Sequence, residues 1–179
     1  MIVHKFLARG AVSPTSRFAW PMPVAGLAGA WVEASGPLAP CARGVHVCRA
    51  IDLAHWLNDE LWALEADGDS IVAVDCIVVR RARLLERIDA WSDGGAMRFA
   101  EACIERAETL LDALATQTSR QLLDDAKEAA SAGYVSASVY ASALAVARRQ
   151  GQNDVEVLFR RERAWQSQWL AGTLLGSEV

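Results

Sequence analysis

The segment from Cys41 to Arg49 gathers the residue types in this chain that are most able to carry out chemistry. It reads Cys-Ala-Arg-Gly-Val-His-Val-Cys-Arg, and a strand through it would put His46 and Cys48 on one face and the valines on the other. Thiolate and imidazole are zinc ligands, and a thiol beside an imidazole is also the pair used in nucleophilic catalysis. His46 and Cys48 are therefore candidate site residues.

A zinc site needs about four such ligands, and this segment supplies three with Cys41. A fourth would have to come from elsewhere in the chain, from His4, His55 or Cys76. The alternative is a buried thiol beside a hydrogen-bonded histidine, which is a common role for a free cysteine in a core. We predict this alternative, with four free thiols, no metal and no cofactor. Two positions on one strand face do not by themselves make a catalytic pair.

Tryptophan supplies a second group of candidates, since the chain has seven tryptophans and only two tyrosines. Tryptophan offers a large contact area and one donor, so it recurs in ligand pockets and interfaces. The candidate binding residues are Trp20, Trp31, Trp62 and Arg49. The alternative is that Trp56, Trp62 and Trp91 belong to the core or its rim.

Near the C-terminus, Leu158, Trp165 and Trp169 share one side of a predicted helix. Such an aromatic stripe must be buried, either against the chain's own helices or against a second copy. Glu162 falls in the same sector, and its arginine neighbours predict a solvated helix edge with local ion pairs.

Alternating and β-branched segments predict a sheet in the first half. We expect strands near residues 2 to 7, 44 to 49, 60 to 65, 71 to 80 and 83 to 89, with a turn at Asp67-Gly68-Asp69 and a short helix from Asp52. Residues 10 to 40 hold all five prolines and predict a long loop with short strands around Phe18 and Trp31.

Helical spacing begins beyond Gly95. One predicted helix face is Ala100, Cys103, Ile104, Ala107, Leu110, Leu111 and Leu114. Further helices are predicted at 119 to 132, ending at Gly133, at 136 to 149, ending at Gly151, and from a cap at Asn153-Asp154. The fold class is therefore α+β. A small mixed or antiparallel sheet in residues 1–92 is covered by helices in residues 96–179, as one integrated domain.

Composition narrows the function classes. The net charge of -4 is spread evenly along the chain, which argues against nucleic-acid binding. The sequence has no stretch of about 18 apolar residues and no secretion signal, so we expect no membrane partner and a cytoplasmic location. The absence of Gly-rich phosphate-binding motifs argues against the commonest nucleotide sites.

Two resemblances follow from these residues. The run Gly44-Val45-His46-Val47-Cys48, followed by an aromatic-bearing helix and the segment 60 to 68, resembles an uncharacterised group of bacterial and phage proteins over about residues 1 to 90. The order of strand, helix and paired strands is also similar to part of the ADP-ribosyltransferase fold. That resemblance implies a carboxylate near the start of a late strand, where this chain has Asp75 in place of the family's glutamate.

Two functional classes stay open. The first is a binding or interaction protein that uses the 10 to 40 loop for a small molecule or a protein partner. The second is a small transferase-type enzyme, similar to ADP-ribosyltransferases, with a pocket around His46, Cys48 and Asp75. We favour the first because local spacing assembles no nucleophile, base and orienting group. In either case the sequence leaves a monomer and a homodimer open.

Overall fold

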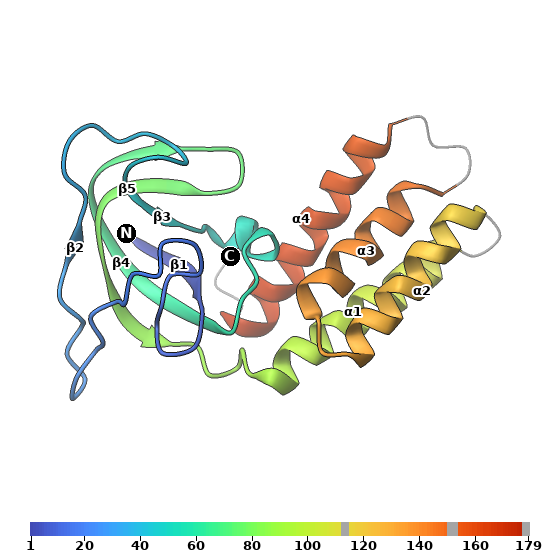
Figure 1. Cartoon of the computed structure of the whole chain (residues 1–179), viewed down its shortest axis with the longest axis horizontal. Coiled ribbons are helices and arrows are strands. Elements are labelled where there is room, and N and C mark those ends of the chain that lie inside the picture. The colour runs from blue at the N-terminus through green and yellow to red at the C-terminus, as the bar shows by residue number, and fades with distance from the viewer. Residues whose placement is uncertain (112–114, 150–153, 177–179) are drawn as a thin grey trace. The chain divides into compact units, whose positions relative to one another are not determined.

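The computed structural model describes residues 1–111, 115–149 and 154–176. The chain divides into two compact units, Met1–Ser92 together with the segment from Ala171, and Asp93–Leu170. The first unit holds the strands and the second holds helices, so the α+β class predicted from the sequence is confirmed (Figure 1).

The sheet of the first unit is antiparallel throughout. Its strands are β1 (Ile2–Leu7), β2 (Val32–Glu33), β3 (Val45–Val47), β4 (Glu60–Val72) and β5 (Ile77–Arg87), and a 3-10 helix, η1 (Ala50–His55), follows β3. The strand order is β1-β4-β5-β2, and β3 pairs with the first residues of β5. The sequences of β1 and of the first part of β5 are rich in β-branched Val and Ile, which fit a half-buried pleated surface.

The sheet curves back on itself at the end of β3. Cys48 forms a bridge with His4 of β1, in which each backbone N–H donates to the other residue's carbonyl oxygen. This bridge places the end of β3 beside β1, although the two strands are separated by β4 and β5 along the sheet. The residues predicted to carry chemistry therefore lie where the curved sheet meets itself.

The predicted turn at Asp67-Gly68-Asp69 is wrong. These residues lie within β4, where the register with β5 shifts between Asp67 and Ser70. Gly68 has a φ of +81°, which suits the irregular backbone of a bulge. The chain turns later, at 73–76, where the N–H of Ala73 donates to the carbonyl oxygen of Cys76. The predicted strand 71 to 80 is consequently split between β4 and β5.

Alternation along the strands separates a core face from an outer face. On β1, Val3 and Leu7 point into the core, and Lys5 shares their face by its spacing. The core of this unit consists of Val3, Leu7, Ala11, Trp20, Val45, Val47, Trp62, Leu64, Ala66, Ile77, Val79, Ala82 and Leu84. Burial of these apolar side chains is a major favourable contribution to the folding of this unit.

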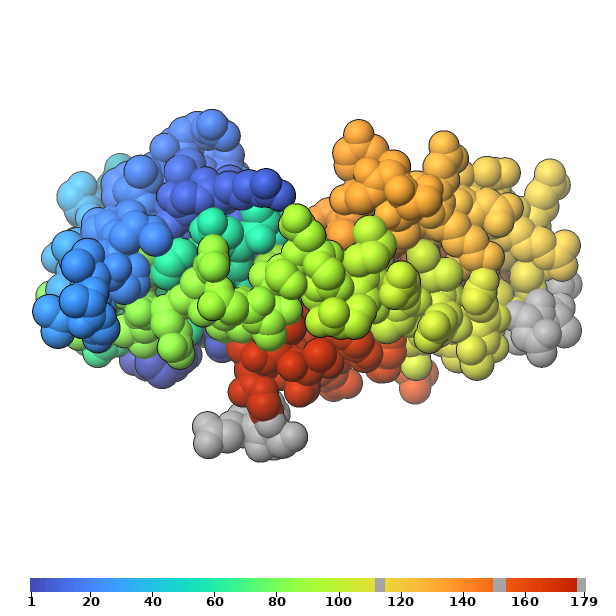
Figure 2. Space-filling model, turned by 90° about the horizontal axis from the view of Figure 1, so that it is seen from below, coloured from blue at the N-terminus to red at the C-terminus, as the bar shows by residue number. Residues whose placement is uncertain are grey.

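The long loop predicted at 10 to 40 is present, and it contains β2 and a bridge between Val12 and Ala19. Four non-glycine residues of the described chain have positive φ, and all lie in or next to this loop: Ala11, Arg17, Ala25 and Cys41. Figure 2 shows this blue part of the chain on the surface of the first unit. Such backbone conformations cost energy and persist only where surrounding contacts enforce them.

The second unit is built from α1 (Asp93–Leu111), α2 (Gln117–Ser131), α3 (Val135–Ala147) and α4 (Val155–Leu174), which continues into the segment from Ala171. The predicted helices are confirmed, with starts and ends shifted by a few residues. Thr116 caps α2 by accepting from the N–H of Ser119, and Asp154 accepts from the N–H of Val157 at the start of α4. The predicted features at Leu114, Gly151 and Asn153 lie outside the described residues.

Helix α3 is buried on several sides. Many of its own buried residues are small, including Ser138, Ser142, Ala143 and Ala147, and small side chains allow neighbouring helices to approach closely. The four helices run beside one another in Figure 1. Among the described residues, no helix combines the length and the hydropathy that a membrane span requires.

Candidate functional site

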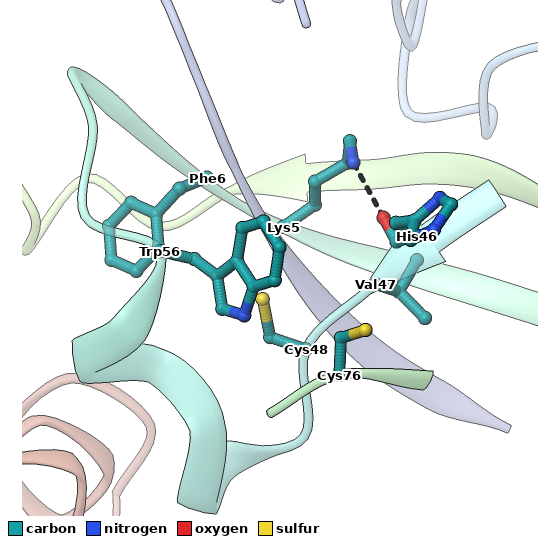
Figure 3. A pocket seen from close by; sticks show the side chains of 7 residues that line it. All are labelled: Lys5, Phe6, His46, Val47, Cys48, Trp56 and Cys76. Carbon is teal, nitrogen blue, oxygen red and sulfur yellow. Dashed lines mark hydrogen bonds between the residues drawn. The ribbon is translucent and has the colours of Figure 1, made fainter. Parts of the chain in front are cut away.

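A small hollow lies where β1, β3 and the start of β5 meet (Figure 3). Its walls are Lys5, Phe6, His46, Val47, Cys48, Trp56 and Cys76. The volume of about 20 Å³ is roughly enough for one water molecule. Ligand pockets for drug-sized molecules are commonly about 300–1,000 Å³. The hollow as it stands therefore accommodates water and not a nucleotide.

His46 uses both ring nitrogens to hold the local backbone. Nε2 accepts from the N–H of Cys41 at 3.0 Å, and Nδ1 lies 3.2 Å from the carbonyl oxygen of Gly44. With Nε2 as an acceptor, Nδ1 is the ring nitrogen placed to donate to the carbonyl oxygen of Gly44. A histidine fixed in this way organises the loop before β3 and has no nitrogen left for a metal or for proton transfer.

Cys48 and Cys76 are both buried, and the structure shows all four cysteines as free thiols. Burial raises the pKa of Cys48 to about 12 and also raises the pKa of Cys76. The reactive form of cysteine is the thiolate, which is scarce at neutral pH when the pKa is so high. Neither thiol is therefore prepared for nucleophilic catalysis.

Asp75, the third catalytic candidate, lies in the turn between β4 and β5. It does not line the hollow, but its backbone carbonyl oxygen accepts from Nε1 of Trp56 at 2.6 Å. Asp75 is thus connected to the hollow through its backbone and through Trp56. The sequence grouped His46, Cys48 and Asp75 as catalytic candidates, and the structure brings only the first two into one wall.

Lys5 is a residue of this site that the sequence reasoning did not select. Its Nζ donates to the carbonyl oxygen of His46 at 2.5 Å and lies 5.8 Å from the centre of the Trp20 ring. Burial lowers the pKa of its amine. A signal was present, because lysine is rare in this arginine-rich chain and Lys5 alternates with Val3 and Leu7.

Trp20 and Trp62, predicted as binding residues, belong to the core of the first unit. Nε1 of Trp20 donates to Oγ of Ser13, and Nε1 of Trp62 donates to Oε2 of Glu60. Their indole N–H groups are thus used inside the protein.

Trp31 is half-buried on the outer side of the sheet. The guanidinium carbons of Arg81 and Arg83 lie 4.7 and 4.6 Å from the centre of its ring. These cations are in turn paired with Asp67 and Glu65 on β4. The arrangement neutralises both arginines and attaches the loop around β2 to the sheet.

Arg49, the remaining predicted binding residue, pairs with Asp52. Its Nε lies 2.6 Å from Oδ2 of Asp52 and its Nη2 lies 2.9 Å from Oδ1. Because Asp52 also accepts from the backbone N–H of Arg49, the pair caps η1. We find Arg49 in a structural role at this helix start.

The three residues predicted for an interface lie on α4. The Trp169 ring contacts Phe99 of α1 with ring centres 5.3 Å apart, and Trp165 lies under the guanidinium of Arg106 at 4.3 Å. Leu158, like both tryptophans, is half-buried. The contacts of Trp165 and Trp169 are thus made with a helix of their own chain.

The tip of the long loop carries exposed apolar side chains that the sequence reasoning also did not select. The backbone N–H of Val24 donates to the carbonyl oxygen of Leu27, and the N–H of Leu27 donates to the carbonyl oxygen of Val24. Ala25 and Gly26 between them have φ values of 52° and 79°. These positive values at both central positions are those of a type I′ turn. The tip is therefore an ordered hairpin.

We use the term apolar loop surface for the four exposed large apolar side chains of this segment, which are Phe18, Met22, Val24 and Leu27. Val24 and Leu27 at the tip are 70% and 73% exposed. The signal in the sequence is Gly26, preceded by two prolines, because glycine and proline both favour turns.

Within the described part of the chain, no group of three His, Cys, Asp or Glu side chains is arranged to hold a metal ion. Comparison of the chain with protein-family models, with curated proteins and with solved structures finds no match.

Proposed function

We propose that this chain is a non-catalytic protein-interaction module, which binds a protein partner through the apolar loop surface of Phe18, Met22, Val24 and Leu27. The observation that carries the proposal is the exposure of Val24 and Leu27 on a hairpin tip whose backbone is held in an uncommon conformation. Ala25 adopts a φ of 52°, which is unfavourable for an L-residue with a side chain.

The loop leading to this tip is fixed at both ends. Glu60 accepts from the N–H groups of Gly10 and Ala11, and the N–H of Gly29 donates to the carbonyl oxygen of Leu84. At Gly29 a β-carbon would lie 2.2 Å from the carbonyl oxygen of Pro21, so the two strands of the loop approach closely. A loop that is ordered before binding loses less conformational entropy when it meets a partner.

Chemistry is less well supported by the same structure. His46 is held by two backbone groups, the buried thiols of Cys48 and Cys76 have raised pKa values, and the hollow between them holds about one water. These features favour binding over a transferase reaction, the second class considered from the sequence.

The test replaces Leu27 with a photo-crosslinking phenylalanine derivative in the host cell, and replaces the exposed Thr15 of the same loop as a control. We expect one discrete crosslinked protein from position 27 and none from position 15. With that partner purified, Leu27→Asp should weaken binding at least about tenfold, since a charge at an apolar contact must be desolvated.

Val74→Asp is the matched control for this measurement, because Val74 is 93% exposed on the turn between β4 and β5 of the same unit. It should leave the affinity unchanged. Equal weakening of binding by Leu27→Asp and Val74→Asp would contradict binding at the apolar loop surface. So would a loss of binding in His46→Asn while Leu27→Asp binds normally.

A further inference from the structure

Cys48 and Cys76 occupy facing positions at the ends of two paired strands. Val47 of β3 lies opposite Ile77 of β5 in the antiparallel ladder. Cys48 follows Val47 and Cys76 precedes Ile77, so the next step of the same register sets the two cysteines opposite each other. Directly opposed residues carry their side chains on the same face of a sheet. Both side chains line the hollow, where Figure 3 shows them at adjacent strand ends.

The backbone hydrogen bonds define what kind of pair this is. The N–H and carbonyl oxygen of Cys48 both bond to His4 on β1, at 2.7 and 2.9 Å. The carbonyl oxygen of Cys76 accepts from Ala73 within the β4–β5 hairpin. These groups are directed away from the opposing cysteine, as in a non-hydrogen-bonded pair. In such pairs the Cα atoms are about 4.5 Å apart, and disulfides span Cα separations of roughly 4.4–6.8 Å.

The surroundings permit a sulfur atom to move. Both residues are 3% exposed, yet the hollow between their strands leaves a volume of about 20 Å³. In the view of Figure 3 the two sulfur atoms point in different directions, as expected of free thiols. Rotation of a side chain into the hollow is the movement that a bond between the two sulfurs would require.

We propose that Cys48 and Cys76 are an oxidation site that forms a reversible cross-strand disulfide with hydrogen peroxide as the oxidant. Both S–H bonds break and one Sγ–Sγ bond forms. The two electrons and two protons released reduce one hydrogen peroxide to two water molecules. The first step gives a sulfenic acid on one cysteine, and the thiol of the other then displaces water to close the bond.

The disulfide would join the end of β3 to the start of β5, and through the His4 bridge it would fasten the place where the sheet meets itself. It closes the chain between residues 48 and 76, which removes conformations from the unfolded state. The oxidised protein should therefore melt at a higher temperature than the reduced protein. This inference concerns the wall of the hollow and does not depend on a partner at the apolar loop surface.

The reaction should be slow at neutral pH and faster in alkaline solution. Hydrogen peroxide reacts with the thiolate, and burial raises the pKa of both thiols. Between pH 7 and 9 the rate should rise with each pH unit, because the fraction of thiolate increases as the pH approaches the pKa.

Trypsin makes the test specific, because cleavage after arginine puts the four cysteines into four peptides. These peptides are 18–43 with Cys41, 44–49 with Cys48, 50–80 with Cys76 and 99–106 with Cys103. The full chain is reduced, freed of reductant, treated with hydrogen peroxide, alkylated and digested without reductant. We expect peptide 44–49 linked to peptide 50–80, a loss of about 2 Da from the intact protein, and reversal by dithiothreitol.

Two variants serve as controls for the linkage. Cys41→Ser removes the exposed thiol near the site, and Cys103→Ser removes a buried thiol of the helical unit whose pKa is also raised to about 12. Both should keep the linked peptides. Cys48→Ser should abolish them and leave Cys76 alkylated, and Cys76→Ser gives the reciprocal result if Cys48→Ser fails to fold.

Oxidation in urea provides the contrast, since an unfolded chain should give several pairings. The proposal is overturned if the native protein gives the same mixture of pairings as the unfolded chain. It is also overturned if Cys76 is found linked to Cys41, or if Cys48 and Cys76 are oxidised to sulfinic acid without forming a disulfide. A linked product that melts no higher than the reduced protein would overturn the stabilising effect.

Discussion

Arg106 on α1 and Glu162 on α4 form a two-contact ion pair, with Nε 2.8 Å from Oε2 and Nη2 3.2 Å from Oε1. Glu162 is only 6% exposed, and the guanidinium of Arg106 also covers the ring of Trp165. A buried carboxylate is tolerated where a cation and hydrogen bonds compensate for its lost hydration. The pair therefore fixes one helix against another inside the second unit.

Removing the carboxylate of Glu162 should show how much the ion pair contributes to stability. Glu162→Ala leaves a cavity and deprives Arg106 of its partner, so we expect a loss of about 3 kcal/mol in the free energy of unfolding. The matched control is Glu156→Ala, since Glu156 meets Arg160 one turn apart at 3.4 Å with both side chains exposed. That substitution should cost less than about 0.5 kcal/mol. Equal losses in urea unfolding would contradict the prediction.

The sequence predicted a solvated helix edge at Glu162, and the structure shows why that was wrong. The neighbouring arginines at 160, 161 and 163 suggested local ion pairs, but the actual partner is 56 residues away on α1. The helical period correctly placed Glu162 between Phe159 and Trp165. It could not say which residue of another helix would face that position, because such pairing depends on how the helices pack.

Trp169→Ala tests the packing of the C-terminal helix. The Trp169 ring contacts Phe99 within its own unit, so truncation leaves a cavity and should cost about 3 kcal/mol of stability. Sedimentation should show the same association state before and after the substitution. Val157→Ala, at an exposed position of the same helix, should change stability little. A parent dimer that becomes a stable monomer in Trp169→Ala would instead identify an interface.

His46→Ala should lower the melting temperature through loss of the two backbone contacts at Cys41 and Gly44. We expect a cost of about 1–2 kcal/mol, typical of a few lost hydrogen bonds at a partly buried position. His46→Asn keeps a polar side chain near the ring's Nδ1 position and should recover part of the stability. A substitution that abolished binding of the partner with unchanged stability would mark His46 as a site residue.

The strands were easier to predict than their pairing. Residues 71 to 80 contain enough β-branched residues to suggest one strand, yet the chain turns at 73–76 and Gly68 sits in a bulge. Glycine and aspartate suit both turns and bulges, so composition alone could not separate them. The proximity of Cys48 to Cys76 follows from this later turn, which is why the sequence treated Cys76 only as a distant zinc ligand.

Metal analysis tests the absence of a zinc site. His46 already accepts from the N–H of Cys41 through Nε2, so zinc binding would require this hydrogen bond to break. Protein purified without added zinc should contain far less than one zinc per chain. Treatment with a chelator should leave its melting temperature unchanged, because structural zinc contributes folding free energy where it is bound. Near-stoichiometric zinc, or melting at lower temperature after chelation, would overturn this reading of the Cys41 to Cys48 segment.

Glu60 connects the long loop to the sheet and should make that connection sensitive to acid. Its carboxylate accepts from the N–H groups of Gly10 and Ala11 and from the indole of Trp62, each at 3.0 Å. Burial acts to raise the pKa of Glu60, but these hydrogen bonds outweigh it and hold the pKa below the ordinary value.

A carboxyl group whose pKa is lower in the folded protein than in the unfolded chain binds fewer protons when folded. Its stabilising contribution is therefore complete above the unfolded pKa of about 4.3 and is lost as the pH falls through the lower folded pKa. Glu60→Gln should lose about 1–2 kcal/mol at neutral pH and show a shallower decline in stability between about pH 5 and 3 than the parent. Glu86→Gln, at an exposed position of β5, should keep the parent's decline. Urea unfolding at several pH values measures both variants, and parallel curves for Glu60→Gln and the parent would show that Glu60 does not anchor the loop.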